Sequence, residues 1–410
     1  MSVDTIPRDA VAACSASGRF DPSDGIDLRE AAALAVYLNP TLRELRAEKG
    51  VAAAQFIEAG LLPNPTIGWS AVDWLVDGTT DSVLTGFGLT WAVPRPGEIP
   101  ARKRVARARM KEVYYSVMAA EWRHVRKVSL AWLEVLGARE RIALNQRLLE
   151  IIRGTYGFLQ RGRAAKTVTA LQENLAGIDL ANVEAERERL LVSERDAWQA
   201  LDVLLGLPPE ARFELQAPSD VFAFVSESPS ADALVEEALA SRPDLKELLA
   251  VYDQAEAALE LEWKRRFPGI AIGTGISIEL PIGSRFNRPA IQTRLAERNR
   301  ARLQVEAAIH ELRQEIYAAL TNLMKTDRPL KFYQENIEPR LEESLRLSSE
   351  ARGVTEITPL ELLTAQEQVL QTQTRYLDLR IQHRKNRELV ATLTGRWFAK
   401  PPPKALKESK

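Results

Sequence analysis

The sequence has little cysteine, little histidine and no long apolar run. Its 410 residues contain one cysteine, Cys14, which excludes an internal disulfide and a metal site built from several thiolates. The three histidines, His124, His310 and His383, lie far apart, and none has a second histidine or cysteine three or four residues away, so we expect no metal site. No apolar stretch approaches the roughly 20 residues that a transmembrane helix needs. Any contact with a membrane is therefore expected from strands or from lipid.

The chain also lacks an excess of charge of either sign. Its 55 basic and 56 acidic residues give a formal net charge of −1, so nothing predicts a general attraction to nucleic acid. The basic run ARKRVARARMK (101–111) has no interleaved aromatic residues, which favours a solvated helix face with anionic lipid headgroups as candidate neighbours. Neither a phosphate-binding loop nor a nucleophile–base arrangement can be recognised. We therefore predict that the protein is not an enzyme and needs no cofactor.

The setting of the single cysteine leaves two interpretations open. Residues 11–14, Val-Ala-Ala-Cys, loosely fit the lipobox at which bacterial lipoproteins are cleaved and acylated. Residues 1–10, however, contain no apolar stretch that could form the core of a signal peptide. Cys14 is either an acylation site or an ordinary cysteine in a disordered leader.

An internal duplication organises the chain. DLREAAALAVYLNPTLREL (27–45) matches SADALVEEALASRPDLKEL (230–248) at a constant offset, and Asp27 with Glu30 predicts a capping box at the first helix. Each copy reads as helix, β-hairpin, long helix, turn and long helix. The predicted divisions are a disordered leader (1–26), a first repeat (27–215), a connecting segment (216–229), a second repeat (230–398) and a disordered tail (399–410).

Long helices dominate both copies. From about 100 to 160 the first copy has no internal proline and is rich in alanine, leucine, arginine and glutamate, which predicts a helix of about 60 residues, roughly 90 Å long. Residues 167–205 form its partner, and about 290–350 and 358–395 repeat the pair. The predicted fold class is mostly α, with long antiparallel helical hairpins duplicated within the chain and two β-hairpins.

The two hairpins differ in length. FPGIAIGTGISIELPIG (267–283) alternates apolar with small or polar residues, the period of a strand with one lipid-facing and one lumen-facing side. A tight turn at Thr274-Gly275 would give two strands of about five residues. The first hairpin (65–94) is about twice as long, with a turn expected at Asp77-Gly78. A soluble hairpin packed against helices is the alternative.

These features together resemble the TolC family of bacterial outer-membrane efflux proteins. The resemblance is carried by residues 39–70, 242–273 and 353–379, and GLLPNP (60–65) is most similar to the subgroup that serves heavy-metal resistance-nodulation-division (RND) pumps. It implies a homotrimer whose copies each give four strands to a shared β-barrel in the outer membrane, with a helical tunnel through the periplasm. The implied function is a passive exit duct for metal ions or small toxic compounds, delivered by an inner-membrane RND-type pump through a periplasmic adaptor (membrane fusion) protein.

The resemblance also suggests where partners contact the chain. The candidate adaptor-docking residues lie at the two helix–turn–helix tips: Gly162, Thr167, Gly353, Thr358 and Leu362. The tips carry possible gate charges of opposite sign, although solvated turn charges explain them equally well: Arg161, Arg163, Glu350 and Glu356. The candidate lipid belt consists of Trp69, Phe87 and Trp91.

Two features depart from the family pattern. No export signal can be recognised, and the short second hairpin would cross only part of a bilayer about 30 Å thick. Unpaired strand backbone in lipid is costly. The short hairpin therefore leaves two interpretations open: the sheet crosses the membrane, or it does not. The alternative function is a soluble or degenerate coiled-coil scaffold of the same ancestry that does not span a membrane.

Overall fold

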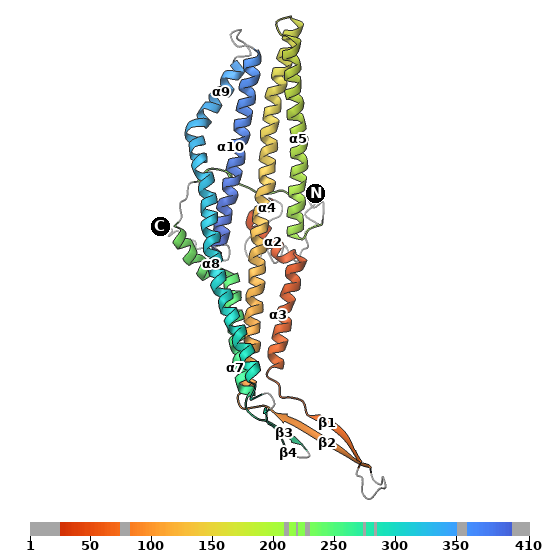
Figure 1. Cartoon of the computed structure of the whole chain (residues 1–410). Coiled ribbons are helices and arrows are strands. Elements are labelled where there is room, and N and C mark those ends of the chain that lie inside the picture. The colour runs from red at the N-terminus through yellow and green to blue at the C-terminus, as the bar shows by residue number, and fades with distance from the viewer. Residues whose placement is uncertain are drawn as a thin grey trace, which may run out of the picture. The chain divides into compact units, whose positions relative to one another are not determined.

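The computed structural model describes residues 25–73, 83–208, 213–218, 220–225, 230–273, 276–282, 285–350 and 359–395 (Figure 1). The first copy consists of α2 (Leu28–Leu38), α3 (Pro40–Glu58), β1 (Thr66–Asp73), β2 (Val83–Val93), α4 (Glu98–Ala164) and α5 (Ala170–Leu205). The second consists of α6 (Ala231–Ser241), α7 (Pro243–Arg265), β3 (Gly269–Gly273), β4 (Ile276–Glu279), α8 (Arg288–Phe332), the π-helix η2 (Tyr333–Ile337), α9 (Glu338–Glu350) and α10 (Pro359–Leu393). The predicted fold class, mostly helical with two β-hairpins, is confirmed.

Several predicted features fall outside the described residues. They are Cys14, nearly all of the leader, the tail and the turns at Asp77-Gly78 and Thr274-Gly275.

The described residues divide into two compact units, and each unit draws on both copies. Unit 1 contains the residues up to Pro40, Glu121–Ser241 and those from Arg313 onward. Unit 2 contains Thr41–Ala120 and Arg242–Leu312. No described helix combines the length and the apolar composition that crossing a membrane requires.

Local sequence signals explain where the helices begin and end. The predicted capping box is present at α2, where Glu30 N–H donates to Asp27 Oδ1 (2.7 Å) and Asp27 N–H donates to the Glu30 carboxylate (2.9 Å). Thr169 and Gln172 form the same motif before α5. Gly206 ends α5 with a φ of 72°, a left-handed conformation that glycine adopts without a Cβ clash.

The two long helices that follow the hairpins are not equivalent. α4 continues for 67 residues, about 100 Å of helix, which confirms the predicted long segment. The corresponding stretch of the second copy is interrupted by the π-turn at Tyr333–Ile337. Pro339 lies two residues after this turn, and proline has no backbone N–H to donate to a regular helix. The long helix of the second copy therefore has a break at Tyr333–Ile337 that α4 lacks.

The two hairpins form one antiparallel sheet in the order β1-β2-β3-β4. β1 pairs with β2 from Thr66↔Thr90 to Asp73↔Val83. β3 pairs with only the last part of β2, from Thr90↔Gly273 to Val93↔Ile270. β3 has five residues and β4 has four, as predicted for the short hairpin.

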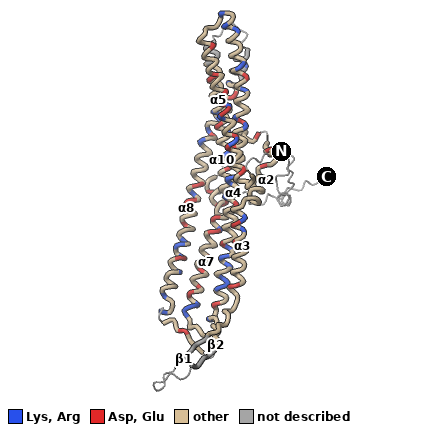
Figure 2. Tube along the Cα trace, turned by 90° about the vertical axis from the view of Figure 1, so that its right-hand side faces the viewer, with Lys and Arg blue, Asp and Glu red and all other residues tan. Residues whose placement is uncertain are grey.

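Each unit is held together by different contacts. A buried apolar cluster forms the core of unit 1 and includes Ile26, Leu34, Trp132, Leu133, Trp198, Leu201, Leu205, Phe222 and Ile381. In unit 2 two cations of run 101–111 pair with acidic residues of α7: Arg104 with Glu260, and Lys111 with Asp253 at 2.7 Å. Figure 2 shows basic and acidic residues interspersed along α3, α7 and α8. Both pairs lie at the surface, with the Arg104 side chain 60% exposed and the Lys111 side chain 50% exposed, as expected for a solvated basic face. Lipid headgroups as neighbours of this face stay a prediction.

Candidate functional site

The sheet of unit 2 has one apolar face that the rest of the chain leaves exposed. The strand register places apolar residues on this face, and seven large apolar side chains on it are exposed: Ile67, Leu89, Trp91, Ile270, Ile272, Ile276 and Ile278. Ile67 is 77% exposed and Ile276 is 76% exposed. These exposures disagree with the alternative of a soluble hairpin packed against helices. Contiguous exposed apolar surface of this kind marks contact with lipid or with another protein.

The opposite face carries small or hydroxylated residues, with one exception. Its members are Thr66, Gly68, Gly88, Thr90, Ala92, Gly269, Ala271, Gly273, Ser277 and Glu279. The close approach of two strands requires glycine at one of these positions, because a Cβ on Gly273 would lie 2.1 Å from the carbonyl oxygen of Leu89. Among strand residues whose side chains are described, Glu279 is the one ionisable residue on this face.

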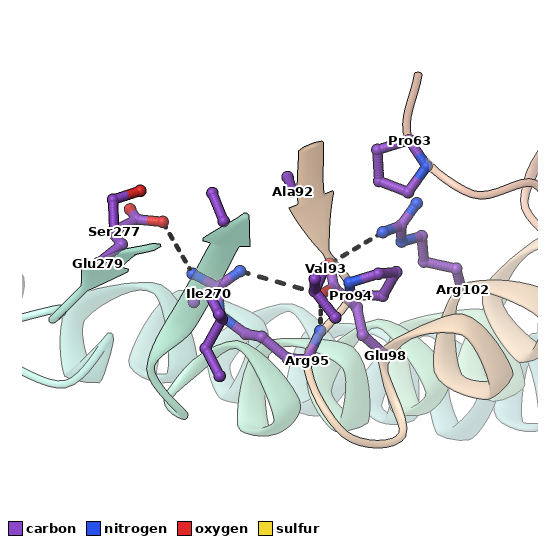
Figure 3. Close-up of a pocket in the computed structure, with 12 residues that line it drawn as sticks. Pro63, Ala92, Val93, Pro94, Arg95, Glu98, Arg102, Ile270, Ser277 and Glu279 are labelled. Carbon is purple, nitrogen blue, oxygen red and sulfur yellow. Dashed lines mark hydrogen bonds and ion pairs between the residues drawn. The ribbon is translucent and has the colours of Figure 1, made fainter. Parts of the chain in front are cut away.

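Arg95 joins this sheet to the beginning of α4. Its Nε donates to the carbonyl of Phe267 (2.8 Å), and its Nη2 donates to Glu279 Oε2 (3.3 Å). The Arg95 backbone N–H donates to the carboxylate of Glu98 (3.1 Å). Figure 3 shows Arg95 between the β-strands and Glu98. A single side chain thus connects the start of β3, the end of β4 and the N-terminal turn of α4.

A cluster of paired charges surrounds this arginine. Glu98 is 6% exposed and also accepts from Arg102 (3.3 Å). Glu262, equally buried, accepts from Arg265 (3.0 Å) and from the side-chain amide of Asn287 (2.7 Å). Burial of these two carboxylates is tolerated because each receives charge-assisted hydrogen bonds. The cluster borders a cavity of about 170 Å³, lined in part by Pro63, Val93, Arg95, Glu98, Ile270 and Glu279 (Figure 3).

Sequence reasoning missed this junction. The partners of Arg95 lie 172 and 184 residues away along the chain, so no local pattern reveals them. The available signal was weak: an arginine between two prolines directly after a strand.

The predicted lipid-belt residues all lie on β1 and β2. Trp91 is 39% exposed, and its indole N–H donates to the carbonyl of Pro63 (2.9 Å). Trp69 and Phe87 are paired directly across the two strands, although their side chains are outside the described set. Their contact with lipid stays a prediction.

The first helix–turn–helix tip brings two of the predicted docking residues together. Both the backbone N–H and the hydroxyl of Thr167 donate to the carbonyl of Gly162, at 2.9 and 3.0 Å. A Cβ on Gly162 would lie 2.5 Å from a methyl group of Val168, so the tight turn requires glycine. Gly353 and Thr358 lie outside the described residues, and Leu362 belongs to α10, with its side chain not described.

The predicted gate charges are only partly described. Arg161 and Arg163 lie in the last turn of α4, and Arg163 approaches Glu173 of the same hairpin (3.9 Å). Glu350 ends α9 without a described side chain, and Glu356 is outside the described residues. Ion pairing between the two tips therefore stays a prediction.

Two of the histidines are held by helix packing in unit 1. His124 Nε2 lies 2.7 Å from the carbonyl of Leu204, and His383, which is 2% exposed, lies 3.5 Å from Asp327 Oδ1. Burial lowers the pKa of both imidazoles. Within the described ranges, no three His, Cys, Asp or Glu side chains gather in a way that could hold a metal ion.

Comparisons with known proteins place these features in context. The chain is 23% identical over 370 residues to the cobalt-zinc-cadmium resistance protein CzcC of Cupriavidus metallidurans, with 86% of each chain covered. It is 24% identical over 383 residues to the pyoverdine export outer membrane protein OpmQ of Pseudomonas aeruginosa, covering 86% of this chain and 77% of OpmQ. The solved outer-membrane channel OprN has the same fold, with a TM-score of 0.76 at 17% identity over 93% of this chain and 95% of OprN. No protein-family model matches the chain.

Proposed function

The chain belongs to the TolC family of bacterial outer-membrane efflux proteins, and we propose that it is the exit channel of a tripartite efflux system. The channel is passive: it receives substrate from an inner-membrane RND-type pump through a periplasmic adaptor. It lies in the outer membrane and extends into the periplasm.

One observation carries this proposal, the two-faced sheet of unit 2. A sheet with exposed isoleucines on one side and glycine, alanine, serine and threonine on the other suits a boundary between lipid and water. Burying the apolar face in lipid would stabilise the assembly by about 25 cal/mol for each Å² removed from water. The small side chains on the opposite face would leave the water-filled interior of the channel wide.

The open edges of the sheet support assembly from several copies. In the described part of the chain, β1 and β4 pair on one side only. Unpaired backbone groups are costly in a bilayer, so the sheet must continue into neighbouring copies. We propose a homotrimer in which β4 of one protomer pairs with β1 of the next protomer. The short β3–β4 hairpin then forms the part of the shared barrel wall that adjoins the helices.

The helix tips are proposed as the contact with the adaptor. Gly162 and Thr167 shape the compact first tip, and Gly353, Thr358 and Leu362 occupy the corresponding second tip. Arg161 and Arg163 would face the acidic residues Glu350 and Glu356 when the channel mouth is closed. Salt-sensitive ion pairs of this kind favour particular partners while contributing little stability.

The cargo is proposed to be metal ions or small toxic compounds. The relative CzcC is described as a cobalt-zinc-cadmium resistance protein, and OpmQ as a pyoverdine export protein. A passive conduit needs no tight ligand for its cargo, because release must be fast.

Fractionation and conductance test the proposed function. The protein should be recovered from outer membranes as a trimer that dissociates on heating in detergent, and the purified trimer should conduct ions across a planar lipid bilayer. Recovery of a soluble monomer that never conducts would instead identify the scaffold alternative.

A further inference from the structure

Glu279 occupies an unusual place on the small-residue face of the sheet. It ends β4 and is paired in register with Gly269, the first residue of β3. Its carboxylate accepts from Nη2 of Arg95 (3.3 Å), as Figure 3 shows. This ion pair lies at the end of the sheet that adjoins the helices, so on the proposed function it lies where the helical tunnel meets the strands.

The pair fits there because Gly269 has no side chain. A Cβ on Gly269 would lie 3.0 Å from Glu279 Oε2 and 3.2 Å from Arg95 Nη2. Both distances are shorter than ordinary van der Waals contact. The carboxylate and the guanidinium therefore meet directly over the backbone of Gly269, on the small-residue face.

The two charges are unequally exposed. The Glu279 side chain is 78% exposed, whereas the Arg95 side chain is 19% exposed. Arg95 is further held by the carbonyl of Phe267 and by Glu98. The neighbouring cations Arg102 and Arg265 pair with Glu98 and Glu262. The charge presented to solvent from this pair is thus negative, with its positive partner behind it.

We infer that Glu279 is a specificity-determining residue that makes the junction favour cations over anions. The inference rests on the proposed function, because it requires the small-residue face to line the pore. Three copies bring three Glu279 carboxylates to one level of the pore, and a ring of acidic side chains raises the local concentration of cations. The favoured cargo is accordingly cationic, which includes divalent metal ions and protonated amines.

Removing the carboxylate should make the local charge less negative. In Glu279→Gln the amide oxygen can still accept from Arg95, so the contact over Gly269 is kept. The guanidinium then keeps only the buried carboxylate of Glu98, which it shares with Arg102, so the surface of the junction loses its exposed negative charge. Glu279→Asp keeps the charge and should retain cation preference.

Ion selectivity in planar bilayers tests the inference. The reversal potential across a KCl gradient gives the K⁺/Cl⁻ permeability ratio for the purified trimer. We expect the ratio to exceed one in the wild type, to fall at least about threefold in Glu279→Gln and to remain near the wild-type value in Glu279→Asp. Glu256→Gln, which removes an exposed charge from α7, is the matched control and should change the ratio much less.

The outcomes separate the two proposals. A trimer that conducts with an unchanged ratio in Glu279→Gln overturns the inference and leaves the channel intact. An equal change in Glu256→Gln also overturns it, because any lost charge would then have the same effect. A wild-type protein that does not conduct contradicts the proposed function itself.

Discussion

The Nε–H of Arg95 donates to the carbonyl oxygen of Phe267, 2.8 Å away in space and 172 residues away in the chain. Arg95 follows the hairpin of the first copy, and Phe267 precedes the hairpin of the second. The bond therefore ties the two halves of the chain together where the first leaves the sheet and the second enters it. It adds to the backbone pairing of β2 with β3 that makes the two hairpins one continuous sheet.

Loss of this arginine should weaken unit 2. Arg95→Gln removes the charge that faces Glu98 and Glu279, and hydrogen bonds to charged groups contribute about 1.5–3 kcal/mol. Arg104→Gln is the matched control, because Arg104 is 60% exposed and pairs with Glu260 at the surface, where a pair contributes at most about 1 kcal/mol. Denaturant unfolding followed by circular dichroism measures both. Equal losses of unfolding free energy would refute the special role of Arg95.

Gly273 should tolerate no side chain. In Gly273→Ala the new methyl group would collide with the Leu89 carbonyl and break the short β2–β3 pairing. Gly50 lies in α3 with open space where its Cβ would be, so Gly50→Ala should stabilise the helix by about 0.5–1 kcal/mol. The yield of heat-sensitive trimer reports the first effect and thermal unfolding the second. A normal trimer yield from Gly273→Ala would contradict the described register.

Gly162 is expected to be essential for the shape of the first tip. Gly162→Ala pushes a methyl group against Val168, which packs with Leu159 in a small buried cluster. Gly157 lies earlier in the same helix, α4. The nearest atom to a Cβ there would be 3.9 Å away, so Gly157→Ala should leave the stability unchanged or raise it slightly. Hydrogen exchange of the amides in residues 162–170 should speed up only in Gly162→Ala. Unchanged protection there would argue against a tightly packed tip.

Stability should fall in mildly acidic solution because of His383. Burial lowers the pKa of this imidazole below 6.5 and outweighs the opposing effect of the Asp327 carboxylate. The unfolded chain then binds more protons than the folded chain, so the contribution of His383 is complete above pH 6.5 and declines as the pH falls toward the folded pKa. His383→Gln should flatten the dependence of unfolding free energy on pH between about 7 and 5.

His310→Gln is the control, because it removes an imidazole from an exposed position of α8. His124 is shifted in the same direction by burial, so some pH dependence should persist in His383→Gln. An unaltered slope in His383→Gln would show that this imidazole does not titrate differently in the two states.

Periodicity predicted the elements well because it depends on local geometry. The alternation around Ile270 and Ile272 identified two faces without knowledge of any partner strand, since strand side chains alternate whatever lies beside them. The length of α4 followed from composition and from the absence of proline. The capping box of Asp27 and Glu30 is likewise a contact between residues three positions apart.

Long-range contacts could not be predicted in the same way. The pairing of β2 with β3 joins Trp91 to Ile272, and nothing in either strand specifies the other. The ion pairs of the basic run of α4 could not be predicted, because a partner such as Asp253 lies 142 residues away from Lys111 in the chain. The π-turn at Tyr333–Ile337 is a local change in the helical hydrogen-bond pattern that composition does not reveal.

The most direct test compares Ala271 and Ile272, neighbours on opposite faces of β3. Ala271→Cys and Ile272→Cys, each combined with Cys14→Ser, are spin-labelled and reconstituted into lipid vesicles. The collision rate of each label with oxygen, which enters lipid, is then compared with its collision rate with a polar nickel complex, which stays in water. The label at position 272 should collide mainly with oxygen and the label at 271 mainly with nickel. Dominant nickel collisions at both positions would contradict a lipid-facing sheet.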